Sequence, residues 1–236
     1  MKYFIVTLLI IVFVFLGTAL YREYKQEAYP EQQILPKNNA PTNIFSEDIS
    51  ESQDQNSQNS AEDNKTPAEF TVHPIDRPVE RITKKPFGIL IDPKTSPVQP
   101  ENFRGYHTGT DFEIFPEETD RNVPVFAVCA GRILAKKVAM GYGGVLVLSC
   151  SLDDQPATII YGHLDLKSVE KEVGDEIKTG EQLGLLGAGY SRETYGERKH
   201  LHLGVHKGSE VNLTGYVKTE KSLENWLNPC DYFCEE

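Results

Sequence analysis

Short apolar runs recur along the chain from about residue 70 onward. They read "FGILI", "VPVFAV", "GRILAKKVAM", "GGVLVLSCSL", "ATIIYGHL", "EQLGLLG" and "HLHLGVH". Each run is rich in Val, Ile and Leu, and most are bounded by Gly, Pro or Asp, which is typical of short β-strands. We expect residues 70–236 to form one mainly β domain of antiparallel sheets and short hairpins, and this length is enough for one substantial core.

One stretch of this region has a convincing helical pattern. It is "TEKSLENWL" at residues 219–227, where Thr219 or Ser222 is a candidate N-terminal cap. The sequence therefore predicts a single short helix near the end of the chain.

The N-terminal 25 residues have a different character. Residues 4–20 contain no charged residue, and this length lies between a signal-peptide core and a typical membrane helix. Lys2 precedes the run, and the small residues Gly17-Thr18-Ala19 offer a cleavage site. We interpret residues 1–25 as a transmembrane anchor or signal segment and favour the uncleaved anchor. Both interpretations place the rest of the chain outside the cytoplasm.

Residues 26–69 form an acidic, polar tract. The tract holds nine Asp or Glu and two Lys, so it carries −7 of the chain's formal net charge of −11. Few aromatics occur and no periodicity persists, so the tract cannot bury enough apolar surface to offset the entropy of ordering. We predict a disordered linker, and the acidic balance argues against nucleic acid as a partner.

The chain has four cysteines, Cys129, Cys150, Cys230 and Cys234. An even number in an exported chain permits disulfides, and four cysteines allow three pairings, among which the sequence does not choose. Cys129 and Cys150 fall in predicted strands, where a free cysteine behaves as a small apolar residue. No CxxC spacing occurs, so the cysteines do not resemble zinc ligands.

Histidines supply the candidate chemistry. The segment "HLH" places His200 and His202 on one face of a strand, because alternate residues of a strand project to the same side. Upstream, "GYHTGTDFEI" contains His107 and Asp111 four residues apart. Two histidines and one aspartate give zinc three ligands and leave a fourth position for water, which is typical of a catalytic rather than a structural site.

The order of HxxxD, then "YGHL", then HxH resembles that of the lysostaphin/LytM-type zinc metallopeptidases, which cut peptide bonds in bacterial cell walls. The resemblance covers roughly residues 83–230 and implies a compact fold similar to the duplicated hybrid motif. It implies that His107, Asp111 and His202 bind Zn²⁺, and that His163 and His200 are catalytic. The two catalytic roles, proton acceptor and proton or oxyanion donor, stay undivided between them.

The chain departs from the family just before "HLH". The family commonly has a Ser/Thr-Gly-Pro run there, whereas this chain has the longer, charged stretch "YSRETYGERK" at residues 190–199. We expect this loop to affect substrate preference and not metal binding. His206 and His73 match no family position, and we expect both to be ordinary strand or surface residues.

Two other functions compete with the peptidase. "VGDEIKTGEQLGLLG" resembles the hairpins of lipoyl and biotinyl carrier domains, but Lys178 in "EIKTG" lacks the sequence around a modified lysine. Some relatives of the family have lost metal ligands and activate other wall hydrolases, whereas all three ligand positions are present here. The sequence thus predicts a membrane-associated, extracytoplasmic zinc metalloendopeptidase acting on peptidoglycan peptides in an open groove, with a non-catalytic regulator as the alternative.

Overall fold

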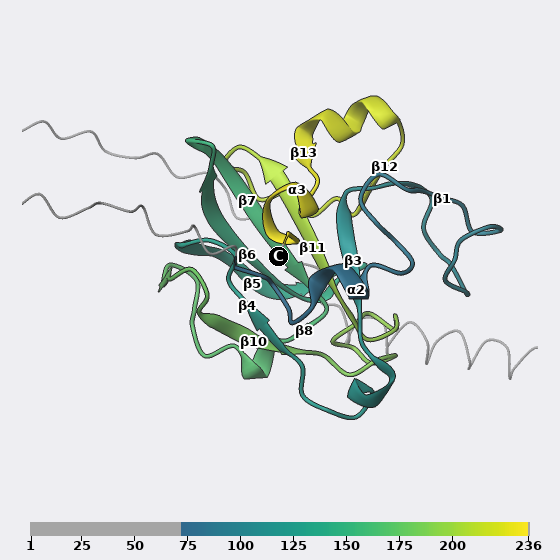
Figure 1. Cartoon of the computed structure of the whole chain (residues 1–236), viewed down its shortest axis with the longest axis horizontal. Helices are drawn as coiled ribbons and strands as arrows, with labels where there is room; N and C mark the ends of the chain where they lie inside the picture. The colour runs from purple at the N-terminus through teal and green to yellow at the C-terminus, as the bar shows by residue number, and fades with distance from the viewer. Residues whose placement is uncertain (1–71, 236) are drawn as a thin grey trace, which may run out of the picture. The chain divides into compact units, whose positions relative to one another are not determined.

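The computed structural model describes residues 72–235, in which strands predominate (Figure 1). The strands are β1 (Leu90–Ile91), β2 (Gly105–His107), β3 (Gly109–Glu113), β4 (Pro124–Phe126), β5 (Gly131–Ala139), β6 (Gly143–Leu152), β7 (Gln155–Gly162), β8 (Leu164–Asp165), β9 (Glu176–Ile177), β10 (Gln182–Leu186), β11 (His200–Lys207), β12 (Tyr216–Val217) and β13 (Trp226–Leu227). The expected N-terminal segment at 1–25 and linker at 26–69 lie outside the described residues.

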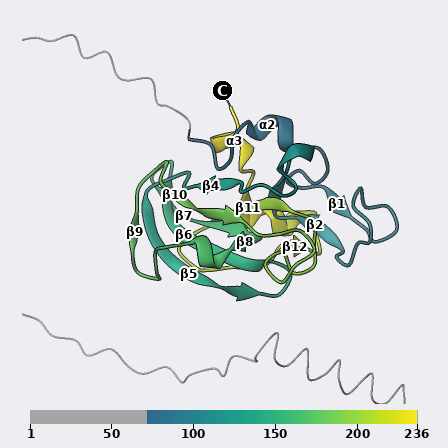
Figure 2. The same cartoon turned by 90° about the horizontal axis from the view of Figure 1, so that it is seen from below.

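The strands form one large sheet and two small ones, and every pair is antiparallel, as the sequence predicts. In the large sheet the order is β13-β11-β7-β6-β5-β9, and β3 also pairs with β11. Figures 1 and 2 show β5, β6, β7 and β11 side by side in this order. The small sheets are β1-β2-β12 and β4-β10-β8.

Strand β6 is buried along nearly its whole length, so its apolar run does not alternate with polar residues. Leu146 and Leu148 belong to the main hydrophobic core, whereas Val145 and Val147 belong to a second cluster with Trp226. Because successive side chains point to opposite faces of a strand, the sheet is covered by apolar side chains on both sides here. This two-sided burial explains why the predicted run, residues 143–152, coincides with the strand.

The helices are short. The predicted helix at 219–227 is a 3-10 helix, η3 (Glu220–Asn225), and its cap is Thr219, whose side chain accepts a hydrogen bond from the Ser222 amide. The other helices are α2 (Pro78–Arg81), α3 (Cys230–Phe233), η1 (Pro116–Glu118) and η2 (Leu166–Ser168). Among residues 72–235, no helix has the length and apolar character needed to cross a membrane.

The cysteines form two disulfides, Cys129–Cys150 and Cys230–Cys234. The expectation that Cys129 lies in a strand is wrong, because it lies in the connection between β4 and β5. From there it joins this connection to β6. The second disulfide joins Cys230, the first residue of α3, to Cys234, the residue that follows the helix.

Replacing Ile159 with alanine tests the core. Ile159 lies in β7 and is fully buried in the main cluster. Removing its branched side chain leaves a cavity, so we expect Ile159→Ala to lower the free energy of unfolding by about 2–5 kcal/mol in urea denaturation. Val173→Ala is the control, because Val173 is 58% exposed, and its effect is expected to stay within about 0.5 kcal/mol. Equal effects of the two substitutions would contradict this assignment of the core.

Candidate metal and catalytic site

Backbone pairing brings the predicted site residues to one place. In the ladder between β3 and β11, His202 lies opposite Asp111, and in the ladder between β7 and β11 it lies opposite Gly162. His163 directly follows β7, and His107 is the last residue of β2. The large sheet and the end of β2 therefore bring together residues that are up to 95 positions apart in the chain.

His107, Asp111 and His202 form a buried cluster suited to a metal ion. His202 Nδ1 lies 3.0 Å from Asp111 Oδ1 and 3.1 Å from His107 Nε2, and these last two atoms are 3.3 Å apart. Two atoms that each lie 2.0–2.1 Å from one zinc ion at a tetrahedral angle are about 3.3–3.4 Å apart. The donor types and the spacing therefore both fit zinc.

Neighbouring groups orient the two imidazoles of the cluster. His107 Nδ1 lies 3.3 Å from the Pro86 carbonyl, which can only accept, so Nδ1 carries the hydrogen and Nε2 presents its lone pair. His202 Nε2 lies 3.5 Å from the Tyr142 hydroxyl, which leaves Nδ1 toward the cluster. Burial, partly offset by the hydrogen bond to Asp111, lowers the pKa of His202 to about 4, so its ring is neutral at neutral pH. A neutral imidazole is the form that binds a metal.

Close packing at Gly109 allows the His202 ring to sit where it does. A Cβ at position 109 would lie 2.5 Å from the Leu203 carbonyl oxygen and 2.7 Å from His202 Nε2. A side chain at this point of "HTGTD" would therefore displace either the β3–β11 ladder or a ligand ring.

His163 and His200 lie together beside the cluster, with ring centroids 4.2 Å apart. His200 Nδ1 is 2.9 Å from the Arg198 carbonyl oxygen, and its Nε2 is 3.3 Å from Asp111 Oδ2. His163 is buried, and its Nδ1 has no hydrogen-bond partner among the described residues. Burial, together with nearby His200, holds the pKa of His163 well below its usual range. His163 is thus a neutral base with a free ring nitrogen.

The backbone at His163 is unusual for a residue with a side chain. Its φ is +66°, in the left-handed region that favours glycine. Two hydrogen bonds hold this conformation: the His163 amide donates to the Tyr142 carbonyl, and the His163 carbonyl accepts from the Gly187 amide. Such conformations persist where the surroundings impose them, and they concentrate at functional sites.

A pocket of about 320 Å³ is lined by four of the predicted site residues, Asp111, His163, His200 and His202. Besides the site residues, its lining includes Lys85, Phe103, Arg104, Met140, Tyr142, Glu197, Arg198, Leu213 and Tyr216. Tyr216 packs between Phe103 and His107, with ring centroids 5.2 and 5.1 Å away, and Lys85 donates to its hydroxyl. Lys85 is itself paired with buried Glu101. The pocket therefore has one aromatic wall held by a buried ion pair.

Sequence reasoning missed the contacts of Arg198 and Glu113. Arg198 donates to Asp111 Oδ2 at 2.9 Å and to both carboxylate oxygens of Glu113. The loop at 190–199, which we expect to affect substrate preference, therefore also supplies a residue, Arg198, that contacts a predicted metal ligand. The signal in the sequence was a charged residue two positions before His200, where the family commonly has glycine.

The remaining histidines lie outside the site. His206 packs against Trp226, with ring centroids 4.8 Å apart, and its Nε2 lies 3.2 Å from the Asn212 side-chain amide. His73 Nδ1 lies 3.0 Å from the Phe233 carbonyl oxygen, at α3. Lys178 is exposed in a turn between β9 and β10. None of these residues lines the pocket.

An antiparallel β domain with a His–Asp–His cluster and two further histidines in an open pocket is the arrangement of a metallopeptidase. Residues 105–213 match the model of peptidase family M23, and this stretch lies within the described β domain. The match begins at β2 and ends before β12, so it includes every predicted site residue.

Individual curated relatives match about half of the chain. Endolysin 2638A of Staphylococcus phage 2638A is 30% identical over 123 residues, which are 46% of this chain and 24% of the endolysin. The chain spans about a quarter of the length of the curated relatives it matches.

Solved structures with similarity to the chain include Csd3 from Helicobacter pylori. It is 25% identical, with 63% of this chain and 34% of Csd3 covered and a TM-score of 0.40. The antimicrobial peptidase lysostaphin from Staphylococcus simulans is 21% identical, with 69% of this chain and 53% of lysostaphin covered and a TM-score of 0.44.

Proposed function

We propose that this chain is an extracytoplasmic zinc metalloendopeptidase that hydrolyses peptide bonds in the stems or cross-bridges of peptidoglycan. The observation that carries the proposal is the buried cluster of His107, Asp111 and His202, with His163 and His200 next to it in an open pocket. The match to a peptidase family supports the reaction type.

His107 Nε2, Asp111 Oδ1 and His202 Nδ1 are the atoms that would hold the metal. A bound zinc ion would supply a Lewis acid and lower the pKa of a water molecule toward about 7. Asp111 has the charged carboxylate that a metal ligand needs. Burial alone would raise its pKa, but His200 and His107 outweigh burial and hold the pKa well below the usual range, so Asp111 is ionised at neutral pH.

The other two histidines handle protons. Peptide hydrolysis needs a group that accepts a proton from the attacking water and a group that donates one to the leaving amine. When His200 Nδ1 donates to the Arg198 carbonyl, its Nε2 is the nitrogen that gains or releases a proton. His163 Nδ1 is free to do the same on the neighbouring ring. A histidine pair thus supplies the proton transfers for which other zinc peptidases use a glutamate.

The test is hydrolysis of bacterial walls by zinc-loaded protein. Walls with different cross-bridges and isolated stem peptides are digested, and the released muropeptides are identified by mass spectrometry. New amino and carboxyl termini at one type of peptide bond are expected, and a chelator is expected to abolish them. If zinc is bound stoichiometrically but every wall and stem peptide stays intact, the peptidase proposal fails. The better hypothesis is then that the chain regulates another hydrolase.

The proposed location rests on two features. The uncharged segment at residues 4–20 supports a membrane anchor, and disulfides persist mainly in oxidising compartments outside the cytoplasm. Protease added to intact cells or spheroplasts tests the location, because an extracytoplasmic domain is degraded without lysis. Protection until lysis would contradict the proposal.

A chain that begins at Phe70 is expected to fold and to cleave substrate at the same rate as the full chain. The physical reason is that residues 26–69 lack the apolar content to contribute to a core. Zinc content and the rate on a soluble peptide measure the outcome. Loss of zinc binding in the shortened chain would show that the acidic tract belongs to the fold.

A further inference from the structure

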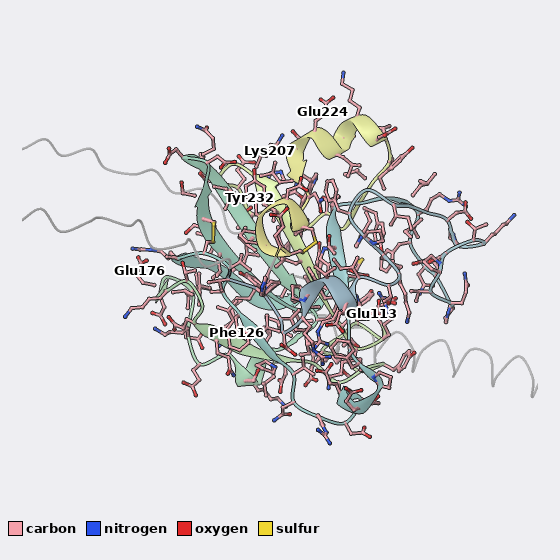
Figure 3. The ribbon with its side chains drawn as sticks, in the orientation of Figure 1. Glu113, Phe126, Glu176, Lys207, Glu224 and Tyr232 are labelled. Atoms are coloured by element: carbon pink, nitrogen blue, oxygen red, sulfur yellow. A yellow bond between two sulfur atoms is a disulfide. The ribbon has the colours of Figure 1, made fainter. Side chains whose placement is uncertain are left out.

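Arg198 and Glu113 form a buried ion pair against the proposed metal site. Each residue is 8% exposed. Glu113 is the last residue of β3, and it lies opposite His200 in the ladder with β11. Arg198 Nε donates to both Glu113 oxygens at 2.9 Å, while Arg198 Nη2 donates to Asp111. Figure 3 labels Glu113, which comes from β3 near α2.

The two oxygens of Asp111 face different partners. Oδ1 lies 3.0 Å from His202 Nδ1 and 3.3 Å from His107 Nε2, which are the other two candidate ligand atoms. Oδ2 lies 2.9 Å from Arg198 Nη2 and 3.3 Å from His200 Nε2. The carboxylate therefore has one oxygen turned toward the cluster and one turned toward the guanidinium.

We propose that Arg198, held in place by Glu113, is a positioning residue that occupies Asp111 Oδ2 and thereby reserves Oδ1 for the metal ion. The inference rests on the proposed function, because it assumes that His107, Asp111 and His202 bind a metal. Arginine suits this role because its planar fork reaches two carboxylates at once, which the single ammonium of lysine does not do in the same geometry. Outer partners of this kind fix the orientation of ligands in metal sites.

Charge alone predicts the opposite effect of losing Arg198. Removing a positive charge next to a metal ligand would strengthen the attraction for a cation. Positioning predicts weaker binding, because an unheld Asp111 samples other rotamers and must be ordered again when the metal binds. The sign of the change in affinity therefore separates the two effects.

The decisive variant combines Arg198→Gln with Glu113→Gln. It removes one positive and one negative charge, so the net charge stays the same. The hydrogen bond from the Arg198 guanidinium to Asp111 Oδ2 is lost. We expect zinc affinity, measured by competition with a chromophoric chelator, to fall roughly 10–100-fold. We also expect the visible absorption bands of the Co²⁺-loaded protein to change, because they report the number and arrangement of ligands.

The matched control is Arg132→Gln with Glu176→Gln. This pair joins β5 to β9 through a side-chain ion pair, and neither residue lines the pocket. It is expected to leave zinc affinity and the Co²⁺ spectrum unchanged. Thermal unfolding of metal-free protein shows whether each variant is folded.

The outcomes are distinct. A folded Arg198/Glu113 double variant with wild-type affinity and spectrum overturns the inference. If that variant does not fold, Arg198→Lys takes its place. Lysine keeps the positive charge but lacks the planar guanidinium that contacts both carboxylates. It is expected to weaken zinc binding and alter the spectrum, and a wild-type result for it overturns the inference. A wild-type chain that takes up neither zinc nor Co²⁺ refutes the proposed function instead.

Discussion

His202→Ala is expected to weaken zinc binding by roughly 10²–10³-fold, which is one ligand's share of a typical zinc-binding free energy. His202 Nδ1 is the atom that contacts both other candidate ligands, at 3.0 and 3.1 Å. His107→Ala and Asp111→Ala are expected to have the same effect. Metal stoichiometry after dialysis against a weak chelator, together with competition titrations, measures the change.

His206→Ala is the matched control for His202→Ala. His206 belongs to the same strand and projects to the same face, but its ring packs on Trp226 and does not line the pocket. Zinc content and hydrolysis are expected to stay at the wild-type level. The assignment of ligands would be reversed if His202→Ala retained zinc and His200→Ala lost it.

His200→Ala and His163→Ala are each expected to reduce turnover by roughly 10²–10⁴-fold while keeping stoichiometric zinc. The three candidate ligand atoms stay in place in both variants, so the metal is retained. Turnover falls because each substitution removes one of the two imidazoles proposed to transfer protons. Their ring centroids lie 4.2 Å apart.

The double variant His163→Ala/His200→Ala separates shared from independent roles. Residues that act as one unit show strongly non-additive effects, so we expect the double variant to be little slower than the slower single variant. Rates on one soluble substrate, with zinc measured in the same samples, provide the comparison. A wild-type rate in His163→Ala would remove that residue from the proposed mechanism.

The strands of the central sheet could be predicted from the sequence because apolar residues dominate them. Strand β11 coincides with the predicted "HLHLGVH" except for one added residue, Lys207. By contrast, "FGILI" contributes only Leu90 and Ile91, because Gly88 has a φ of +76° and bends the chain just before them. Conformations that depend on a single positive φ leave little trace in an apolar pattern.

The histidines and Asp111 of the site could be named from the sequence, but their arrangement could not. One oxygen of Asp111 accepts a hydrogen bond from Arg198, which pairs with Glu113, a residue 85 positions away in the chain. Either residue alone is an ordinary charged side chain. Only the β3–β11 ladder places them together, so no local pattern indicates that they form a pair.

The β3–β11 ladder also determines when the site comes into existence. Its strands are separated by residues 114–199, about half of the described domain, so the ends of a long connection must meet before His202 lies opposite Asp111. A nascent chain that has emerged only as far as β10 already contains His107 and Asp111, yet it lacks the strand that completes the cluster. We therefore expect capture of the proposed metal ion to coincide with closure of the sheet, and an ion bound there would stabilise the whole domain by mass action.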